Sequence, residues 1–283
     1  MKRRIRALCA HTFLLASVPC CGGSDGFPAE WGSVDEVSSA LVNHNALNPN
    51  ALNPNALNPN ALDPIALAPN RLASNALSAA VRAAITRPGE LGAMSRQLLQ
   101  YIVSCALTPS QSFRFSWRDE RGELREEVYR GYLGLAASWA IAPLSESREQ
   151  WVSACVASRA NRAGVSVMIS SRAAHLALRH PDASEVESYP MEEGAFWGNL
   201  FATPPRLYAC YNESNVESAR ALSRDCAAGL PEPGGGVREC PNIHIVGSCD
   251  LACDAPGAAD GYRPSCTDDR GESWSAVITT FLP

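Results

Sequence analysis

The placement of the cysteines constrains the fold of this chain more than any other feature. Eleven cysteines occur in 283 residues. Eight of them lie beyond residue 100: Cys105, Cys155, Cys210, Cys226, Cys240, Cys249, Cys253 and Cys266. An even number in an exported chain is typical of a disulfide framework, whereas a cytosolic address would favour free buried thiols. Because eight cysteines allow 105 pairings, the sequence alone leaves the full connectivity open.

The other three cysteines lie in a segment with the features of a secretory signal. Four basic residues (Lys2, Arg3, Arg4 and Arg6) precede a mostly apolar run, Ala7–Val18, and small residues follow it. This order is typical of an export signal. A helix that spans a membrane needs about 18 or more apolar residues, and this run is shorter. We therefore interpret residues 1–21 as a signal peptide.

The end of the signal also resembles a bacterial lipoprotein signal, because apolar residues run into Pro19-Cys20-Cys21-Gly22-Gly23. Cys21 or Cys20 would carry the lipid, although Pro19 fits such a site poorly in either frame. We expect an exported protein, periplasmic or on the cell surface, that meets the membrane only through such an anchor.

The charge balance argues against nucleic acid as a partner. Removing the signal takes away four of the 24 basic residues and none of the 29 acidic ones, so the remaining chain carries a net charge of −9. An acidic surface repels phosphate backbones, and the sequence contains no basic stripe.

A strict five-residue repeat, Ala-Leu-Asn-Pro-Asn, follows a linker at residues 22–44. The repeated leucines are Leu47, Leu52, Leu57, Leu62, Leu67, Leu72 and Leu77. A period of five fits neither a helix nor a strand, and proline in each unit removes donors that both need. Each Asn-Pro-Asn-Ala favours a type I turn. One interpretation is a right-handed β-helix of pentapeptide repeats. The one we favour is an extended, turn-rich spacer over residues 45–71.

A helix or linker at residues 72–88 leads into a single domain, residues 89–283, which is long enough to bury a core. Apolar periodicity predicts helices at 96–107 and 147–161, and alternation predicts strands at 113–118, near 124–132 and at 165–170. Beyond residue 204 the sequence is rich in loops and cysteines. We therefore expect an α+β fold with a helical first half and a disulfide-stapled C-terminal part.

Two cysteines lie on the apolar sides of predicted helices. Cys105 lies beside Ile102 and Leu98, and Cys155 lies beside Trp151 and Val152. If the helices pack directly, these cysteines come within bridging distance, which predicts a Cys105–Cys155 disulfide. The other six lie close together in sequence, and we expect Cys210 to pair with Cys226 and the last four cysteines to pair among themselves.

No established catalytic motif occurs in the sequence, and we expect no cofactor and no metal. His175 and His180 lie five residues apart, but nothing selects a serine for them, so ordinary histidines are the favoured interpretation. Cys249, Cys253 and His244 have a spacing that suggests zinc. A second cysteine hook is missing, and disulfides are the favoured alternative.

The most distinctive local segment is Met191–Phe201, with adjacent carboxylates, two glycines and three aromatic residues. Glu192, Glu193, Phe196 and Trp197 are candidates for a sugar-binding groove. Adjacent strand residues point to opposite faces, so the two carboxylates are not expected to act as a catalytic pair. The favoured alternative is an aromatic core segment that turns on its two glycines.

Several segments together resemble a group of exported, lipoprotein-like proteins from large G+C-rich bacterial genomes. They are the repeat behind a Cys-Gly-Gly start, WVSACVASRANRAGVSVMIS, EEGAFWGNLF and LYAC. The resemblance covers most of the chain after residue 40. It implies export and one Cys-rich domain, and it implies no activity.

The sequence favours a non-catalytic envelope module that binds glycan or protein. The alternative is a secreted hydrolase with a site that carries no known motif. A binding module predicts an exposed aromatic platform near Phe196 and Trp197. An enzyme predicts a deep cleft with a perturbed His175, Glu192 or Glu193.

Overall fold

The computed structural model describes residues 41–44, 52–58, 60–257 and 261–283, which all belong to one compact unit. The predicted signal peptide, Cys20, Cys21 and most of the linker lie outside the described residues. The fold is α+β with four disulfides, as predicted from the sequence. Within the described ranges, no helix has the length and hydrophobicity that crossing a membrane requires.

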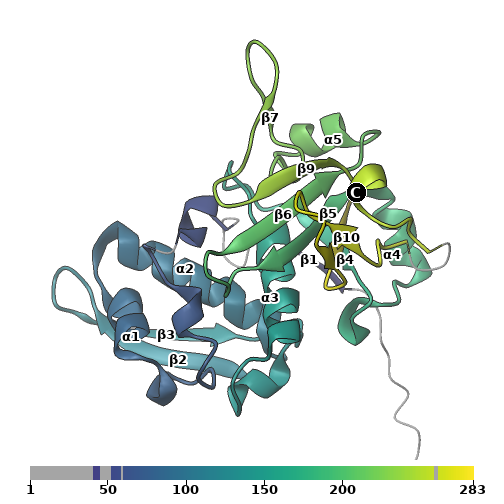
Figure 1. The fold of residues 1–283 in the computed structure, drawn as a ribbon. Coiled ribbons are helices and arrows are strands. Elements are labelled where there is room, and N and C mark those ends of the chain that lie inside the picture. Colours follow the sequence, from purple (N-terminus) through teal and green to yellow (C-terminus); the bar gives the residue numbers. More distant parts are fainter. Residues whose placement is uncertain (1–40, 45–51, 59, 258–260) are drawn as a thin grey trace, which may run out of the picture. The chain divides into compact units, whose positions relative to one another are not determined.

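The first half of the unit is built from two helices and a hairpin (Figure 1). Helix α1 (Ala79–Thr86) begins at Ser78, whose hydroxyl accepts from the N–H of Val81, and α2 (Gly89–Ala106) follows after Pro88. The antiparallel hairpin of β2 (Ser112–Arg118) and β3 (Leu124–Arg130) matches the predicted alternation.

Arg96 of α2 ties these elements together. Its Nη1 donates to the carbonyls of Ile85 and Arg87 at 3.0 and 2.8 Å, which satisfies groups at the end of α1. Its guanidinium also lies 3.5 Å from the centroid of the Trp117 ring in β2. A single buried arginine therefore joins α1, α2 and the hairpin.

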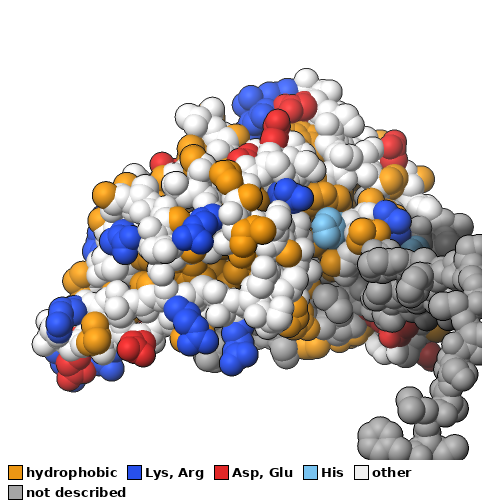
Figure 2. Space-filling model, turned by 90° about the horizontal axis from the view of Figure 1, so that it is seen from below, with side chains coloured by type: hydrophobic (Ala, Val, Ile, Leu, Met, Phe, Trp, Pro, Cys, Tyr) orange, Lys and Arg blue, Asp and Glu red, His pale blue; other side chains and the backbone are white. Residues whose placement is uncertain are grey.

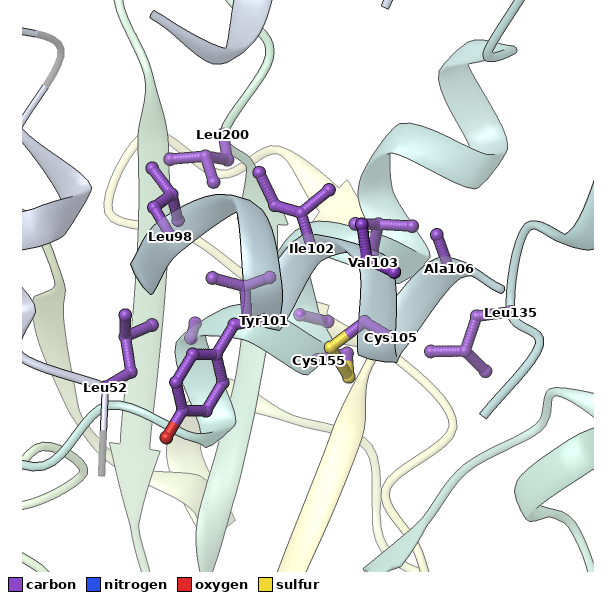
Figure 3. Close-up of a cluster of buried hydrophobic side chains, with 14 of the residues drawn as sticks. Leu52, Leu98, Tyr101, Ile102, Val103, Cys105, Ala106, Leu135, Cys155 and Leu200 are labelled. Atoms are coloured by element: carbon purple, nitrogen blue, oxygen red, sulfur yellow. A yellow bond between two sulfur atoms is a disulfide. The ribbon is translucent and has the colours of Figure 1, made fainter. Parts of the chain in front are cut away.

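Helix α3 (Glu146–Ser158) lies between α2 and the main sheet, and its C-terminal half is fully buried. Cys105 of α2 and Cys155 of α3 form a disulfide with a Cα–Cα distance of 5.9 Å, so the predicted pairing is confirmed. Figure 3 shows this bond among the side chains of α2, with Leu200 from the sheet side and Leu52 from the repeat nearby.

The main sheet has six strands in the order β1-β4-β12-β5-β6-β9. All neighbours are antiparallel except β9, which runs parallel to β6. The strands are β1 (Leu41–His44), β4 (Met168–Arg172), β5 (Met191–Asn199), β6 (Arg206–Tyr211), β9 (His244–Ser248) and β12 (Ile278–Leu282). The predicted linker at 22–44 thus ends in an edge strand, and the strand predicted at 165–170 begins three residues later.

Beyond residue 204 the chain supplies β6, β9 and β12 of the sheet, and the rest of this part is short elements joined by loops, as predicted. Helix α4 (Ala183–Ser188) lies before it. The short elements are α5 (Val216–Ala221), β7 (Leu230–Pro231), β8 (Val237–Arg238), α6 (Cys249–Ala252), β10 (Cys266–Thr267) and β11 (Ser273–Trp274). The predicted Cys210–Cys226 pair is wrong. The disulfides are Cys210–Cys249, Cys226–Cys240 and Cys253–Cys266. The reason is the parallel pairing of β9 with β6, which brings Cys249 beside Cys210.

The repeat differs from the expected spacer. From Leu52 onward it forms short 3-10 turns (η1 Pro54–Leu57, η2 Pro64–Ala66, η3 Ser74–Ala76). Asn53, Asn58 and Asp63 each accept from the backbone N–H two residues later, which gives the predicted Asx-Pro turns. One turn per unit returns the leucines to the same side. Five of them are 3% exposed or less: Leu52, Leu57, Leu62, Leu67 and Leu72.

Backbone hydrogen bonds also fix the repeat to the rest of the fold. The N–H of Asn161 donates to Leu52 O, that of Leu72 donates to Trp139 O, and that of Leu144 donates to Ala68 O. The spacer interpretation is therefore wrong for the described repeats. The folded unit begins well before residue 89, since α1 and the repeat are part of its core.

We expect Leu57→Ala to lower the free energy of unfolding by about 2–4 kcal/mol, because it leaves a cavity in a fully buried site. Urea unfolding measures the loss. The matched control is Asn55→Ala, an exposed position in the same turn, which should change stability by less than about 0.5 kcal/mol. Equal stability of Leu57→Ala and the parent chain would show that the repeat is a detached spacer.

We also expect replacement of Cys105 and Cys155 by Ala to destabilise more than replacement of Cys253 and Cys266. The sequence separations are 50 and 13, and the loop-entropy model gives about 4 and about 3 kcal/mol. Thermal unfolding of the two double variants makes the comparison. A larger loss of stability in the Cys253 and Cys266 variant would show that loop length does not determine how much each disulfide stabilises the fold.

Candidate functional site

The predicted aromatic platform is not on the surface. Phe196 and Trp197 are both 0% exposed and lie on opposite faces of β5. Phe196 belongs to the main core beside α3, and Trp197 stacks on Tyr208 of β6 with 6.0 Å between ring centroids. The favoured alternative, an aromatic core segment, is correct for their burial, but the segment does not turn on its glycines, since β5 runs continuously from Met191 to Asn199. Gly194 belongs to this packing, since a Cβ there would lie 2.1 Å from the carbonyl oxygen of Cys210.

The two carboxylates of the same strand are held by arginines. Glu193 accepts from Arg224 at 2.9 Å, and both side chains are at most 1% exposed. Glu192 pairs with Arg263 at 2.8 Å and accepts from Asn212. Both carboxylates are engaged by arginines and the two aromatic rings are buried on opposite faces of β5, so the structure does not bring the four candidate residues of β5 together as one binding site.

His175 is half-buried before the short 3-10 turn η5 (Leu176–Leu178). Its Nδ1 accepts from the N–H of Ala177 at 3.2 Å, and the ring packs edge-on against Trp151. Burial lowers the pKa of His175, and this outweighs a hydrogen bond to the Leu135 backbone that raises it. An acceptor role for Nδ1 requires the deprotonated nitrogen, which agrees with the lowered pKa of His175.

The strongest candidate site is an open pocket of about 310 Å³ that sequence reasoning did not find. Three segments line it: the start of β6, the loop between β8 and β9, and the turn between β10 and β11. The polar side chains in its lining are Arg206, Tyr208, Glu239, Asn242, His244, Asp269 and Arg270. We call this the His244 pocket.

Each wall of the His244 pocket is held by a disulfide. Cys226–Cys240 anchors the loop before β9, Cys210–Cys249 joins the ends of β6 and β9, and Cys253–Cys266 fixes the start of β10. Arg162 adds to this by donating to the carbonyls of Arg238 and Glu239. These loops bury little apolar surface, so the disulfides rather than hydrophobic packing hold them in place.

Within the pocket, a carboxylate orients the imidazole of His244. Glu239 Oε1 lies 3.0 Å from His244 Nδ1 and also accepts from the N–H of Ile245 at 2.8 Å. Nε2 of the same ring lies 3.9 Å from Asp269 Oδ2. With Nδ1 beside Glu239, the ring turns its Nε2 toward Asp269.

Asn242, at the bend of the loop, has a φ of 65°, a left-handed conformation that asparagine tolerates better than most residues. Tyr208 also lines the pocket. Burial first, and then the charge of Asp268, raises its pKa, so its hydroxyl stays protonated. The site therefore offers a fixed imidazole, two carboxylates, two arginines and an amide.

A zinc site at Cys249 and Cys253 does not fit the geometry. Both sulfurs are committed to disulfides, with Cys210 and Cys266, so neither offers a thiolate. His244 lies instead with Glu239 and Asp269. Nε2 and Asp269 could supply two ligands to a cation, fewer than the four that structural zinc uses.

The residues of the pocket carry no local signature. Tyr208 and Asp269 are about 60 residues apart in sequence, and the disulfides that bring them together could not be paired from spacing. The one available signal was His244 between Cys240 and Cys249, in a loop-rich segment with crosslinks on both sides.

No family model, no curated protein and no solved structure matches this chain. Its function therefore has to be inferred from the site itself.

We expect the stability of the protein to fall as the pH is lowered from about 7 to about 5.5. Because the folded-state pKa of His175 is lowered, the unfolded chain takes up the proton first. The contribution of His175 is thus present above its ordinary pKa of about 6.5 and is lost below it. His175→Asn keeps an acceptor near Ala177 but does not titrate, so it should flatten the profile.

Urea unfolding at a series of pH values measures this slope. The matched control is His180→Asn, which removes an exposed histidine five residues away. An unchanged slope in His175→Asn, or a flattened one in the control, would contradict the assignment.

Proposed function

We propose that this chain is an exported, non-catalytic module of the cell envelope and that the His244 pocket binds one unit of a neutral, hydroxyl-rich glycan. The observation that carries the proposal is the framing of a polar pocket by three disulfides. Loops held in this way lose little conformational freedom on binding, which favours affinity for a small ligand.

The charges in the pocket indicate the kind of ligand. Glu239 and Asp269 disfavour an anion, whereas Arg206 and Arg270 disfavour a cation. Arg206 is already paired with Glu272 at 2.6 Å, but in the part of the chain that the structure describes the Arg270 side chain has no recorded hydrogen bond. A sugar hydroxyl both donates and accepts, so it can satisfy both kinds of group.

The size of the pocket supports a small unit rather than a large surface. Its volume of about 310 Å³ is near the lower end of the range for ligand pockets. Because it opens to solvent, one residue of a longer chain could enter while the rest stays outside.

The glycan proposal requires that the protein be exported from the cytoplasm. Four disulfides indicate an oxidising compartment outside the cytoplasm. We further propose that residues 1–21 direct export and that Cys21 or Cys20 carries a lipid, which would place the pocket near envelope glycans.

The Glu239–His244 pair favours a second candidate, a secreted hydrolase. A carboxylate that orients an imidazole is the arrangement of a general base. However, the lining of the pocket contains no serine or threonine, and Cys240 is in a disulfide. The nucleophile would have to be water.

We expect at least one neutral polysaccharide fragment from a panel of bacterial cell-wall and capsular glycans to bind the oxidised protein. His244→Ala and Asp269→Asn should each weaken binding about tenfold, because the first removes a hydrogen-bonding group and the second replaces a charged acceptor with a weaker neutral one. Glu232→Gln, an exposed carboxylate on another loop, is the matched control and should bind like the parent chain. Titration calorimetry measures the affinities, and circular dichroism verifies folding.

Binding that is unchanged in both pocket variants would contradict the proposal, as would a panel without any binding. Release of new reducing ends from the bound glycan, abolished in His244→Ala, would instead establish the hydrolase.

A further inference from the structure

A second hollow, of about 660 Å³, lies on the helical half of the unit. One wall is a stripe of α2 at helical spacing: Glu90, Ala93, Met94, Gln97 and Gln100. The other wall is Glu127, Val128 and Tyr129 of β3, and Asn53 of the repeat lies at the hollow as well. We call it the α2–β3 groove.

The groove runs along the free edge of β3. Glu127 and Tyr129 point to one face of the hairpin and Val128 points to the other, yet all three line the groove. A hollow that touches both faces of a strand must meet its edge. No residue of β2 lines the groove, so this is the edge that faces away from β2.

The register of the hairpin shows which backbone groups this edge offers. The N–H of Gly131 donates to Gln111 O, and that of Asp119 donates to Glu123 O. In an antiparallel ladder every second residue pair is joined by backbone hydrogen bonds. Counting in from the two ends, Phe113–Tyr129 and Phe115–Glu127 are hydrogen-bonded pairs, and the pairs between them are not. The N–H and C=O of Val128 therefore point outward, away from β2.

Among the residues that the structure describes, neither the N–H of Val128 nor that of Glu126 donates a recorded hydrogen bond. An unpaired edge of this kind is a template for another strand. The hollow of about 660 Å³ between this edge and the α2 stripe is the space that such a strand would enter.

The charges of the groove favour a basic partner. Glu90, Glu127 and Arg96 line it, so two carboxylates face one guanidinium. Glu127 Oε1 accepts from Trp117 Nε1 at 3.0 Å, and the Arg96 guanidinium is engaged by the end of α1 and the Trp117 ring. On the face seen in Figure 2, basic side chains are spread singly among uncharged and hydrophobic ones, and no continuous basic surface forms there.

We propose that the α2–β3 groove binds an extended, basic peptide segment of another protein, which adds to β3 as a third strand. Backbone hydrogen bonds to Val128 provide affinity independent of sequence, and Glu90 and Glu127 select Lys or Arg side chains. This interaction is separate from the His244 pocket and does not depend on the glycan proposal.

The test uses fluorescence polarisation with a labelled, alternating Thr-Lys peptide. An alternating Thr-Glu peptide tests charge, and a Thr-Lys peptide N-methylated at alternate residues tests strand pairing. We expect the unmodified Thr-Lys peptide to bind and the other two to bind at least about tenfold more weakly. Val128→Pro removes an outward N–H without breaking a hydrogen bond to β2, and it should weaken binding to a similar extent.

The double variant Glu90→Gln and Glu127→Gln should weaken binding about fivefold. Its matched control is Glu146→Gln with Glu187→Gln, which removes the same charge from exposed positions elsewhere. If Val128→Pro fails to fold, the N-methylated peptide still decides the strand pairing.

Three outcomes would overturn the proposal. One is the absence of Thr-Lys binding, and another is equally tight binding of the N-methylated or the Thr-Glu peptide. The third is a dimer of this chain that Val128→Pro dissociates, because the edge would then serve a second copy.

Discussion

The burial of α3 is the constraint on which the rest of the structure depends. The Cys105–Cys155 disulfide joins α3 to α2, and the hydroxyl of Ser153 accepts from the N–H of Leu200 next to β5. Arg224 extends from the Cys-rich part to the carbonyls of Ser158 and Ala160, while Glu193 balances its charge. Because all three connections meet on one helix, the hydrophobic half and the crosslinked half form one unit.

Local sequence patterns predicted the helices with an apolar stripe and the strands with alternating apolar residues. The alternation from Phe113 to Trp117 predicted β2, and the apolar stripes around Cys105 and Cys155 predicted both helices and their disulfide. The repeat was misjudged because its order comes from distant partners. Trp139 and Asn161 bond its backbone, and no five-residue pattern encodes them. The His244 pocket was missed for a related reason, since its walls meet only after the disulfides are paired.

The folded repeat also matters for recognition. Asn53 lies at the α2–β3 groove, and its N–H donates to Gln97 of α2 at 3.4 Å. If the repeat were a detached spacer, Asn53 would not lie at the groove. The two proposed surfaces thus depend on different forces. Apolar packing of the repeat in the core places Asn53 at the groove, whereas crosslinks in a loop-rich region hold the walls of the His244 pocket.

Native-state hydrogen exchange tests most directly whether the repeat belongs to the same cooperative unit as α3. Leu67, Leu72 and Ala61 donate backbone hydrogen bonds, and their exchange can be followed in increasing denaturant. The account predicts that these amides exchange with the same opening free energy as the buried amides of α3. Exchange of the repeat within seconds, while α3 stays protected, would contradict it.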